Sequence, residues 1–560
     1  MGSDVKHVVD PAQGSQGRAG RRRLIQAAGL VSALTMTSRV LGLVRETAFA
    51  ALLGTTVHGD AFRIAFRFPN MLRDLFAEGA LSAAFVPTYS KVLNEEGRER
   101  ANQLVGRVIT LLLVIVSGLL VAAYVGARPL VGELAPGFRD IPGKLDMTAD
   151  LTRVTFVFLP FVSLSAVAMG MLNAEHRFGL PAFAPAVFNL VAIIWAGGLW
   201  WSGASPAGVA FGWAIGVVLG GVAQLVIQLP ALGRQGFRLR LSWSPRDPGV
   251  VRILRLMAPA TIGLAAIQIN VVVNSRFASW EPGAVSWLEF AFRLLHLPIG
   301  VFGVALGTIA GAGLARRAAH GDMDGFRETL RDSLRLVWFV AIPATLGLVV
   351  LREPIVRLIY ERRRFTAEDT LATAAALGLY AIGLVGYTAV KVLAPAFYAL
   401  NQSRTPLLGS LAAVGTNLVL VVFLNPLFGF RAIALAMAVG ALVNASVLLI
   451  AFERREGGLR GQGLGGGGLM MGLAAIPMGI AVWGSEAGLS AWLGDTSLPA
   501  RLAGTLLPIV LGVMVYAATS MALGVPEVRR IVSMIRERRA SLPTGQDPES
   551  NARTRSGGDA

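Results

Sequence analysis

The sequence predicts an all-α polytopic membrane protein, and three observations support this fold class. Of the 560 residues, 54% are hydrophobic and only 15% are charged, with a mean hydropathy of +0.60; a soluble domain has about 25% charged residues. Apolar runs of roughly 20 residues, long enough to cross about 30 Å of hydrocarbon as a helix, recur along the chain. Positive charge gathers in alternate loops between these runs.

About 14 transmembrane helices are expected from the apolar runs. Short polar or charged breaks separate them, and several contain internal glycine or proline. The runs lie near residues 25–53, 60–92, 103–128, 150–173, 181–202, 206–230, 252–279, 284–315, 333–351, 371–400, 405–425, 431–452, 465–486 and 500–524.

The net charge of +17 is spread over loops and tails. With the N-terminus in the cytoplasm, the loops on that side hold roughly thirty lysines and arginines against about ten opposite, which is the positive-inside bias. No nucleic-acid partner is therefore expected, and both termini are expected to be cytoplasmic. The outward loop around ERRRFTAED breaks the pattern.

The first 23 residues are polar, end in RRR and predict a disordered cytoplasmic tail. A signal peptide is the alternative, because AFAA at 48–51 imitates a cleavage site, but Arg39 and Arg45 would interrupt its apolar core.

Enzyme chemistry is poorly represented in the sequence. The chain has no cysteine, so it has neither a disulfide framework nor a thiolate site. It lacks the phosphate-loop, HExxH and GxSxG patterns. The glycine run at 461–468 resembles a phosphate cradle, but no strand precedes it and no lysine follows, which favours a linker before the last two helices. No cofactor or metal is expected.

Arginines in the first two spans need an explanation, because each costs on the order of 2.5–3.5 kcal/mol at mid-membrane unless it faces protein or water. Arg39 and Glu46 are seven residues apart and share a helix face, and a bend near Gly42 would bring Arg45 to the same cavity. Pro69 removes a backbone donor and predicts a kink before Arg73.

Local pairing is the alternative explanation for the charges of the second span. Asp60, Arg63 and Arg67 are spaced three and four apart, so they share a helix face and can pair with one another. Arg73 has Asp74 or Glu78 as its candidate local partner.

A second charged site is predicted in SWLEFAFRLLHLPIG at 286–300. Glu289 precedes Arg293 by four residues, the favourable orientation for a helix ion pair, and His296 follows Arg293 by three. Either the pair neutralises itself against protein, or Arg293 and His296 face the cavity of the first two helices. The tripeptide AFR at 65–67 and 291–293 would be equivalent in two parallel six-helix halves.

Several long motifs resemble the MurJ (MviN) family of bacterial lipid II flippases, within the multidrug/oligosaccharidyl-lipid/polysaccharide exporter superfamily. They are SRVLGLVRETAFAALLGTT, DAFRIAFRFPNMLRDLFAEGALSAAFVP, RFGLPAFAPAVFN, GVFGVALGT and KVLAPAFYA, and the likeness runs from about residue 24 to 525.

The resemblance implies two six-helix lobes around a central cationic cavity, at 24–232 and 250–455. Two further helices at 464–525 would form a groove for a lipid tail, and a basic cytoplasmic tail follows at 526–560. The implied location is the bacterial cytoplasmic (inner) membrane. The implied activity is transfer of undecaprenyl diphosphate bearing a disaccharide-pentapeptide to the outer leaflet for peptidoglycan synthesis, by alternating access. The cell-wall synthesis machinery is the implied partner.

The family's cavity residues fall on numbered positions of this chain. The essential arginines fall on Arg39, Arg45, Arg73 and Arg293, and the acids of helix two on Asp60 and Glu78. Some relatives carry acids where this chain has Phe292 and His296, and Glu289 is expected to restore that charge. Some relatives resemble sodium-coupled carriers that have an aspartate in the seventh helix. The seventh expected span of this chain, at 252–279, has no aspartate, which argues against sodium coupling.

Three other kinds of function stay open. An exporter of another polyprenyl-linked glycan, or of a drug, belongs to the same superfamily, although a cation exporter would need a carboxylate-rich pocket. A membrane scaffold without transport activity would have no need of cavity arginines. An enzyme acting on the lipid would lack an evident nucleophile.

Overall fold

The computed structural model describes residues 11–74, 80–458, 463–494 and 497–529. Within these ranges the chain forms helices and connecting turns, with no strand. The predicted fold class, an all-α polytopic membrane protein, is confirmed.

The first half of the chain contains the helices that surround the candidate site. Their bounds are α1 Pro11–Leu52, α2 Val57–Arg73, α3 Ala80–Glu95, α4 Gly97–Leu134, the 3₁₀ turn η2 Pro136–Asp140, α5 Lys144–Phe156, α6 Phe158–Ala174, α7 Gly179–Trp201, α8 Pro206–Val226, α9 Leu229–Arg234, α10 Pro248–Ala278 and α11 Ala284–Pro298.

The second half begins with a π-helical turn directly after α11. Its bounds are η3 Ile299–Val304, α12 Ala305–Ala319, α13 Met323–Val350, α14 Arg352–Tyr360, α15 Ala367–Ile382, α16 Leu384–Ala399, α17 Arg404–Phe428, α18 Phe430–Arg455, α19 Leu464–Leu493 and α20 Leu498–Ala522.

Ten helical segments of the described chain are long and apolar enough to cross a membrane, or up to 11 if the broken pair α15 and α16 is one span. Each coincides with one predicted span. The other three predicted spans coincide with α1, with α2 and α3, and with α10. Two of these three carry the arginines and acids of the first two predicted helices, so the charged spans are those that composition identifies least readily.

Contacts divide the chain into two compact units. The first comprises residues 1–295, 355–380 and 407–444, and the second comprises residues 296–354, 381–406 and 445–560. These units do not coincide with the predicted lobes 24–232 and 250–455, whose boundaries stay predictions. α1 begins at Pro11, inside the predicted tail 1–23, and residues 1–10, 75–79 and 530–560 lie outside the described ranges.

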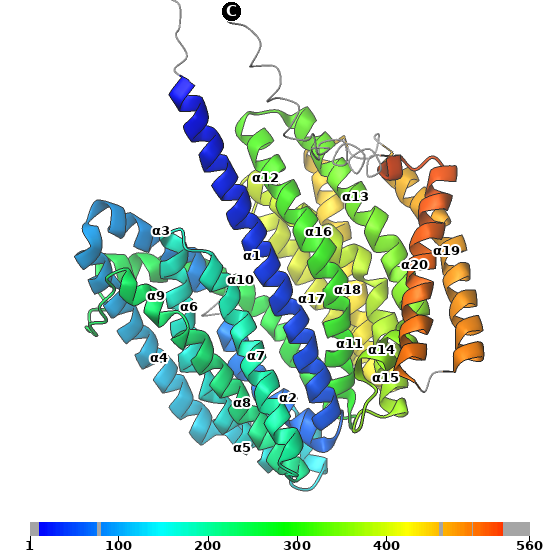
Figure 1. Cartoon of the computed structure of the whole chain (residues 1–560), viewed down its shortest axis with the longest axis horizontal. Helices are drawn as coiled ribbons and strands as arrows, with labels where there is room; N and C mark the ends of the chain where they lie inside the picture. The colour runs from blue at the N-terminus through cyan, green and yellow to red at the C-terminus, as the bar shows by residue number, and fades with distance from the viewer. Residues whose placement is uncertain (1–10, 75–79, 459–462, 495–496, 530–560) are drawn as a thin grey trace, which may run out of the picture. The chain divides into compact units, whose positions relative to one another are not determined.

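In the first unit, α1 packs along α7, and α7 packs on α8 (Figure 1). The turn from α1 to α2 is tight. Gly54 has a φ of +56°, and a Cβ there would lie 2.5 Å from the carbonyl oxygen of Arg364, so only glycine fits without strain. Thr56 caps α2 by accepting a hydrogen bond from the Gly59 amide. This turn fixes where the charged face of α2 begins.

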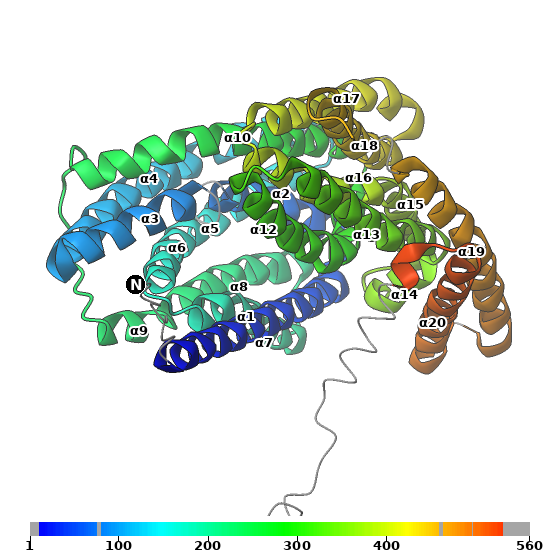
Figure 2. The ribbon, with the colours of Figure 1, turned by 90° about the horizontal axis from the view of Figure 1, so that it is seen from above.

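In the second unit, α19 and α20 lie side by side as a hairpin (Figure 2), and α13 packs on α19. The glycine run predicted as a linker is partly helical, because α19 begins at Leu464. A Cβ at Gly467 would lie 3.0 Å from the guanidinium carbon of Arg335. The missing side chain therefore lets α19 approach α13, which corrects the linker prediction.

Candidate functional site

Glu46, near the end of α1, is the centre of an ionic cluster in the first unit. Its side chain is only 8% exposed. It accepts hydrogen bonds from Arg45 of the same helix at 2.9 Å, from Arg63 of α2 at 3.4 Å and from Arg293 of α11 at 3.2 Å. One buried carboxylate thus joins arginines from three helices.

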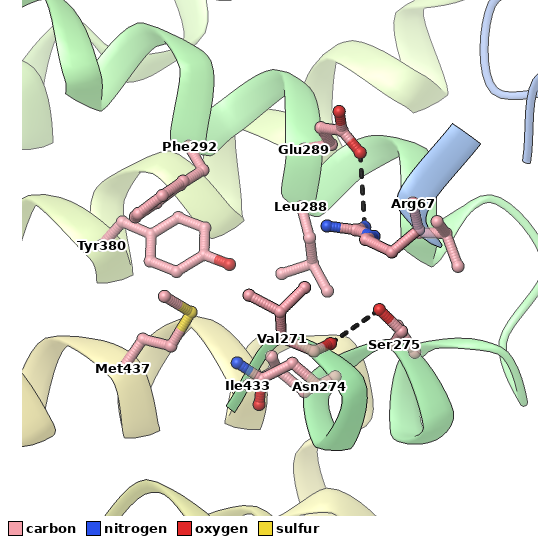
Figure 3. A pocket seen from close by; sticks show the side chains of 12 residues that line it. Arg67, Val271, Asn274, Ser275, Leu288, Glu289, Phe292, Tyr380, Ile433 and Met437 are labelled. Carbon is pink, nitrogen blue, oxygen red and sulfur yellow. Dashed lines mark hydrogen bonds and ion pairs between the residues drawn. The ribbon is translucent and has the colours of Figure 1, made fainter. Parts of the chain in front are cut away.

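Glu289 of α11 extends the cluster. Its Oε1 lies 3.0 Å from Nη1 of Arg63, and its Oε2 accepts a hydrogen bond from Nη2 of Arg67 at 3.3 Å (Figure 3). Arg63 therefore bridges both carboxylates. We call Arg45, Glu46, Arg63, Arg67, Glu289 and Arg293 the arginine network.

The arginine network holds four arginines and two glutamates, so its net formal charge is +2. Exposure is uneven: the Arg293 side chain is 44% exposed and that of Arg45 16%, whereas that of Arg63 is 4%. A guanidinium offers a planar fork of donors that matches carboxylate and phosphate oxygens. The accessible surplus of positive charge suits an anion with such oxygens.

Arg63 is additionally held between two aromatic rings. Its guanidinium carbon lies 4.4 Å from the ring centroid of Phe49 and 4.1 Å from that of Phe290. Each contact is a favourable cation–π geometry. Phe290 in turn packs on Tyr360 of α14, with ring centroids 4.6 Å apart.

Two of the predicted arginines lie outside the arginine network. The half-buried Arg39 of α1 makes no hydrogen bond or ion pair with any described residue. Arg73 pairs with its neighbour Asp74 at 2.9 Å, as the local alternative predicted. Glu78 lies outside the described residues. The structure thus brings Arg45 and Arg293 together, and the cavity roles of Arg39 and Arg73 stay predictions.

The predicted pairing of Asp60 with Arg63 and Arg67 is wrong. Asp60 is 1% exposed and lies 3.1 Å from Nζ of Lys144, at the start of α5. It also accepts hydrogen bonds from the Gly283 amide at 2.9 Å and from the amide and hydroxyl of Ser286 at 3.2 and 2.7 Å. We call these four residues the Asp60 junction. Arg63 and Arg67 turn to the glutamates because Lys144 and α11 already satisfy Asp60.

The predicted ion pair between Glu289 and Arg293 is wrong, because each of these residues pairs with a different one. Arg293 bonds Glu46, and Glu289 bonds Arg63 and Arg67. Each carboxylate pairs with an arginine of another helix, because Arg63 and Arg67 of α2 reach Glu289 of α11. His296 is exposed and belongs to the second unit, so its place relative to the arginines stays a prediction.

A cavity of about 110 Å³ lies beside the Arg67–Glu289 pair (Figure 3). Asn274 and Ser275 of α10 contribute polar groups to it, and Phe292 packs on Tyr380 at its edge with ring centroids 5.2 Å apart. The arginine network therefore has space next to it that is neither fully apolar nor fully charged. In the described ranges, no group of three or more His, Asp or Glu side chains could hold a metal ion.

Sequence reasoning missed the roles of Arg63 and Lys144 and gave Glu46 too little weight. A signal for Glu46 was present, because an acid beside Arg45 inside a membrane span must find buried cations. Lys144 carried no comparable signal, since it stands in a polar break between two expected spans.

The sequence profile of a family described as "Lipid II flippase MurJ" matches residues 49–502, more than half of the chain. The chain belongs to the MurJ family. The resemblance stated from the motifs is therefore confirmed, and with it membership of a transporter family.

Relatives in the MurJ family cover most of the chain. "Lipid II flippase MurJ" of Burkholderia cenocepacia is 36% identical over 438 residues, covering 77% of this chain and 84% of the relative. "Probable lipid II flippase MurJ" of Vibrio cholerae is 35% identical, covering 76% and 82%. "Probable lipid II flippase MurJ" of Bdellovibrio bacteriovorus is 32% identical over 527 residues, covering 93% of this chain and 98% of the relative.

Solved structures agree with this membership. The structure titled "Lipid II flippase MurJ, inward closed conformation" is 25% identical, covers 88% of this chain and 98% of its own, and has a TM-score of 0.73. An inward-facing multidrug resistance MATE family transporter of the MOP superfamily, 15% identical with a TM-score of 0.60, covers 77% and 99%. This second likeness shows the fold alone.

Proposed function

We propose that this protein is a lipid II flippase, which moves undecaprenyl-diphosphate-linked disaccharide-pentapeptide from the inner to the outer leaflet by alternating access. The observation that carries the proposal is the arginine network of a MurJ-family chain, with its net charge of +2 and its accessible Arg45 and Arg293. The diphosphate of lipid II is the part of the substrate that such a site suits, because its anionic oxygens match guanidinium forks.

Arg39, Arg45, Arg73 and Arg293 are the proposed diphosphate ligands. Arg39 supports this role because it has no partner among the described residues and is half-buried. Asp60, Glu78, Glu289 and His296 are the proposed supporting charges. For Glu289 the role is to neutralise Arg63 and Arg67 while the substrate engages the other arginines.

The membrane potential is the proposed energy source. Each negative charge that moves outward across the full field gains about 2.3 kcal/mol per 100 mV, so two charges on a diphosphate gain about 4–5 kcal/mol, less what moving cavity charges cancel. The protein acts in the bacterial cytoplasmic membrane with both termini in the cytoplasm. The machinery that consumes lipid II outside is the partner class that this function implies.

Complementation tests the proposal. A flippase-depleted bacterium that expresses this chain should regain growth, and lipid II scored by leaflet should shift to the outer leaflet. Accumulation of lipid II on the inner leaflet despite matched expression would overturn it. Orientation can be measured in parallel, because the chain has no cysteine. A single cysteine placed in the loop at 235–246 should react with an impermeant thiol reagent only after the membrane is opened.

A further inference from the structure

Arg63 differs from the other arginines of the arginine network in its accessibility. Its side chain is 4% exposed, against 16% for Arg45, 24% for Arg67 and 44% for Arg293. A ligand entering from water can reach Arg293 and Arg45 before it reaches Arg63. Arg63 is therefore placed to contact protein groups and not substrate.

The contacts of Arg63 fix both its position and its orientation. The rings of Phe49 and Phe290 hold its guanidinium plane from α1 and α11. Its two terminal nitrogens then point to different carboxylates, with Nη2 at 3.4 Å from Glu46 and Nη1 at 3.0 Å from Glu289. A lysine at this place would supply one ammonium and could not present this fork.

Anion binding at the accessible arginines creates an electrostatic problem at Glu46. Arg45 and Arg293 supply two of its three guanidinium partners. An anion that takes their donors competes with the carboxylate, and a buried carboxylate left without a partner is strongly unfavourable. The charged or titratable groups around Glu46 are Arg45 of α1, Arg63 of α2, Arg293 of α11 and, behind Phe290, Tyr360 of α14.

We infer that Arg63 is a positioning residue that retains Glu46 and Glu289 as fixed counterions, so that Arg45 and Arg293 can exchange the Glu46 carboxylate for the substrate diphosphate. This inference rests on the proposed function. Glu46 keeps Arg63 as its partner after the exchange, and Glu289 keeps Arg63 and Arg67. The complex is then neutral, because a diphosphate diester carries two negative charges and the arginine network carries +2.

The test is a binding series on the purified full-length protein, with a short-chain lipid II analogue as the probe. Arg63→Gln should weaken binding at pH 7.5 by roughly tenfold or more. When the diphosphate takes Arg45 and Arg293 in this variant, the buried carboxylate of Glu46 is left without a cationic partner. The double variant Arg63→Gln with Glu46→Gln removes the stranded carboxylate and restores the net charge of +2, so its binding should return to within about threefold of wild type. Arg63→Lys should lie between the wild type and Arg63→Gln.

The dependence on pH supplies a readout that a merely structural role would not move. At pH 5.5 Arg63→Gln should regain much of its affinity, because Glu46 can take up a proton once its permanent partner is absent. The wild type should change little between pH 7.5 and 5.5. Arg107→Gln is the matched control, since Arg107 pairs with Asp247 and not with the arginine network, and it should bind as the wild type does at both values.

Each outcome decides the inference. Arg63→Gln that folds and binds like the wild type overturns it, and so does a double variant that binds no better than the single one. If Arg63→Gln cannot be purified, Arg63→Lys decides, with an undiminished affinity at pH 7.5 counting against the inference. If the wild type rejects lipid II but binds another polyprenyl diphosphate diester, the proposed function fails and the series proceeds with that probe. A wild type that binds neither probe overturns both.

Discussion

Two clusters of charge on α2 lie only three residues apart and are built on opposite principles. The Asp60 junction sets one lysine against one aspartate, both 1% exposed, and its remaining hydrogen bonds come from α11 and the turn before it. The arginine network sets four arginines against two glutamates and leaves Arg293 nearly half exposed. The balanced cluster is closed to ligands, whereas the unbalanced one requires a further anion to become neutral.

This difference distinguishes a cluster of charges that holds the fold together from a cluster that can bind a ligand, although α2 contributes residues to both. Removal of one partner from a buried ion pair destabilises the folded protein strongly, because the other partner is left as an uncompensated buried charge. Excess cationic side chains beside a cavity are stabilised electrostatically when an anion binds to them. Mutations in the two clusters should therefore affect different measurements.

The largest effect is expected at the Asp60 junction. Lys144→Met should destabilise the protein by about 3–5 kcal/mol, because it leaves Asp60 buried without its cation. The loss will be seen as a fall in yield and in unfolding temperature. Addition of Asp60→Asn should restore part of both. Normal yield of Lys144→Met would show that the junction is not the structural cluster we describe.

Arg293→Gln should show the opposite pattern. Glu46 keeps Arg45 and Arg63, and the Arg293 side chain is 44% exposed, so the free energy of unfolding should change by less than about 1 kcal/mol. Transport should nevertheless fall by roughly tenfold or more, because an accessible fork is lost. A variant that transports normally at matched expression would remove Arg293 from the proposed site.

Arg45→Lys combined with Arg73→Lys sharpens the comparison by separating charge from shape. Lysine keeps the positive charge but removes the planar fork, and its ammonium is more strongly hydrated. Transport should fall by several fold to about tenfold if bidentate contacts matter. Complementation at the wild-type level by a well-expressed double variant would leave electrostatic attraction as the reason for arginine.

The smallest effect is expected at a cluster outside the membrane-spanning segments. Asp247 caps α10 through the amides of Gly249 and Val250 and binds Arg100 at 2.8 Å. Burial raises the pKa of Asp247. Hydrogen bonds from Arg100 and Val250 and the charges of Arg100 and Arg107 lower this pKa by more than burial raises it, so it lies below the ordinary value of 3.8. Asp247→Asn should lose about 1 kcal/mol of stability at pH 7, because asparagine can still cap α10 but loses the ion pairs with Arg100 and Arg107. Transport should be unchanged.

The pH dependence of this last effect follows from the lowered pKa. An aspartate whose pKa is depressed in the folded state stabilises it above the ordinary pKa, and the contribution is lost as the pH falls through the folded value. The gap in unfolding temperature between wild type and Asp247→Asn should therefore narrow below about pH 3.8. A gap that stays constant would show that the ionised carboxylate of Asp247 is not the source of the loss.

The fold was predictable from the sequence because membrane spans are read from local composition. α7, for example, coincides within a few residues with the apolar run at 181–202. The π-helical turn at Ile299–Val304 was not predictable, since no apolar pattern separates a π turn from an α-helix. The span at 465–486 anticipated α19, which begins at Leu464, but the reading of the glycine run at 461–468 as a linker was wrong, because Gly467 and Gly468 pack against α13 within the helix.

The candidate site was predictable in its residue types but not in its pairings. The presence of Arg45 and Arg293 in apolar spans predicts a protected environment for each. Which acid each meets depends on how α1, α2 and α11 pack. Spacing along one helix therefore suggested Glu289 for Arg293, whereas the structure supplies Glu46, 247 residues away in the sequence.

The Asp60 junction also has a consequence for how the protein is made. Asp60 is synthesised 84 residues before Lys144 and 223 residues before Gly283. At about 5–20 residues per second, the carboxylate waits roughly 10–45 s for its last partners. Until Lys144 follows, after roughly 4–17 s at this rate, α2 would carry an unpaired acid into lipid, at a cost of several kcal/mol. The second helix must therefore be sheltered by the insertion machinery during synthesis, until α5 and α11 have entered the membrane.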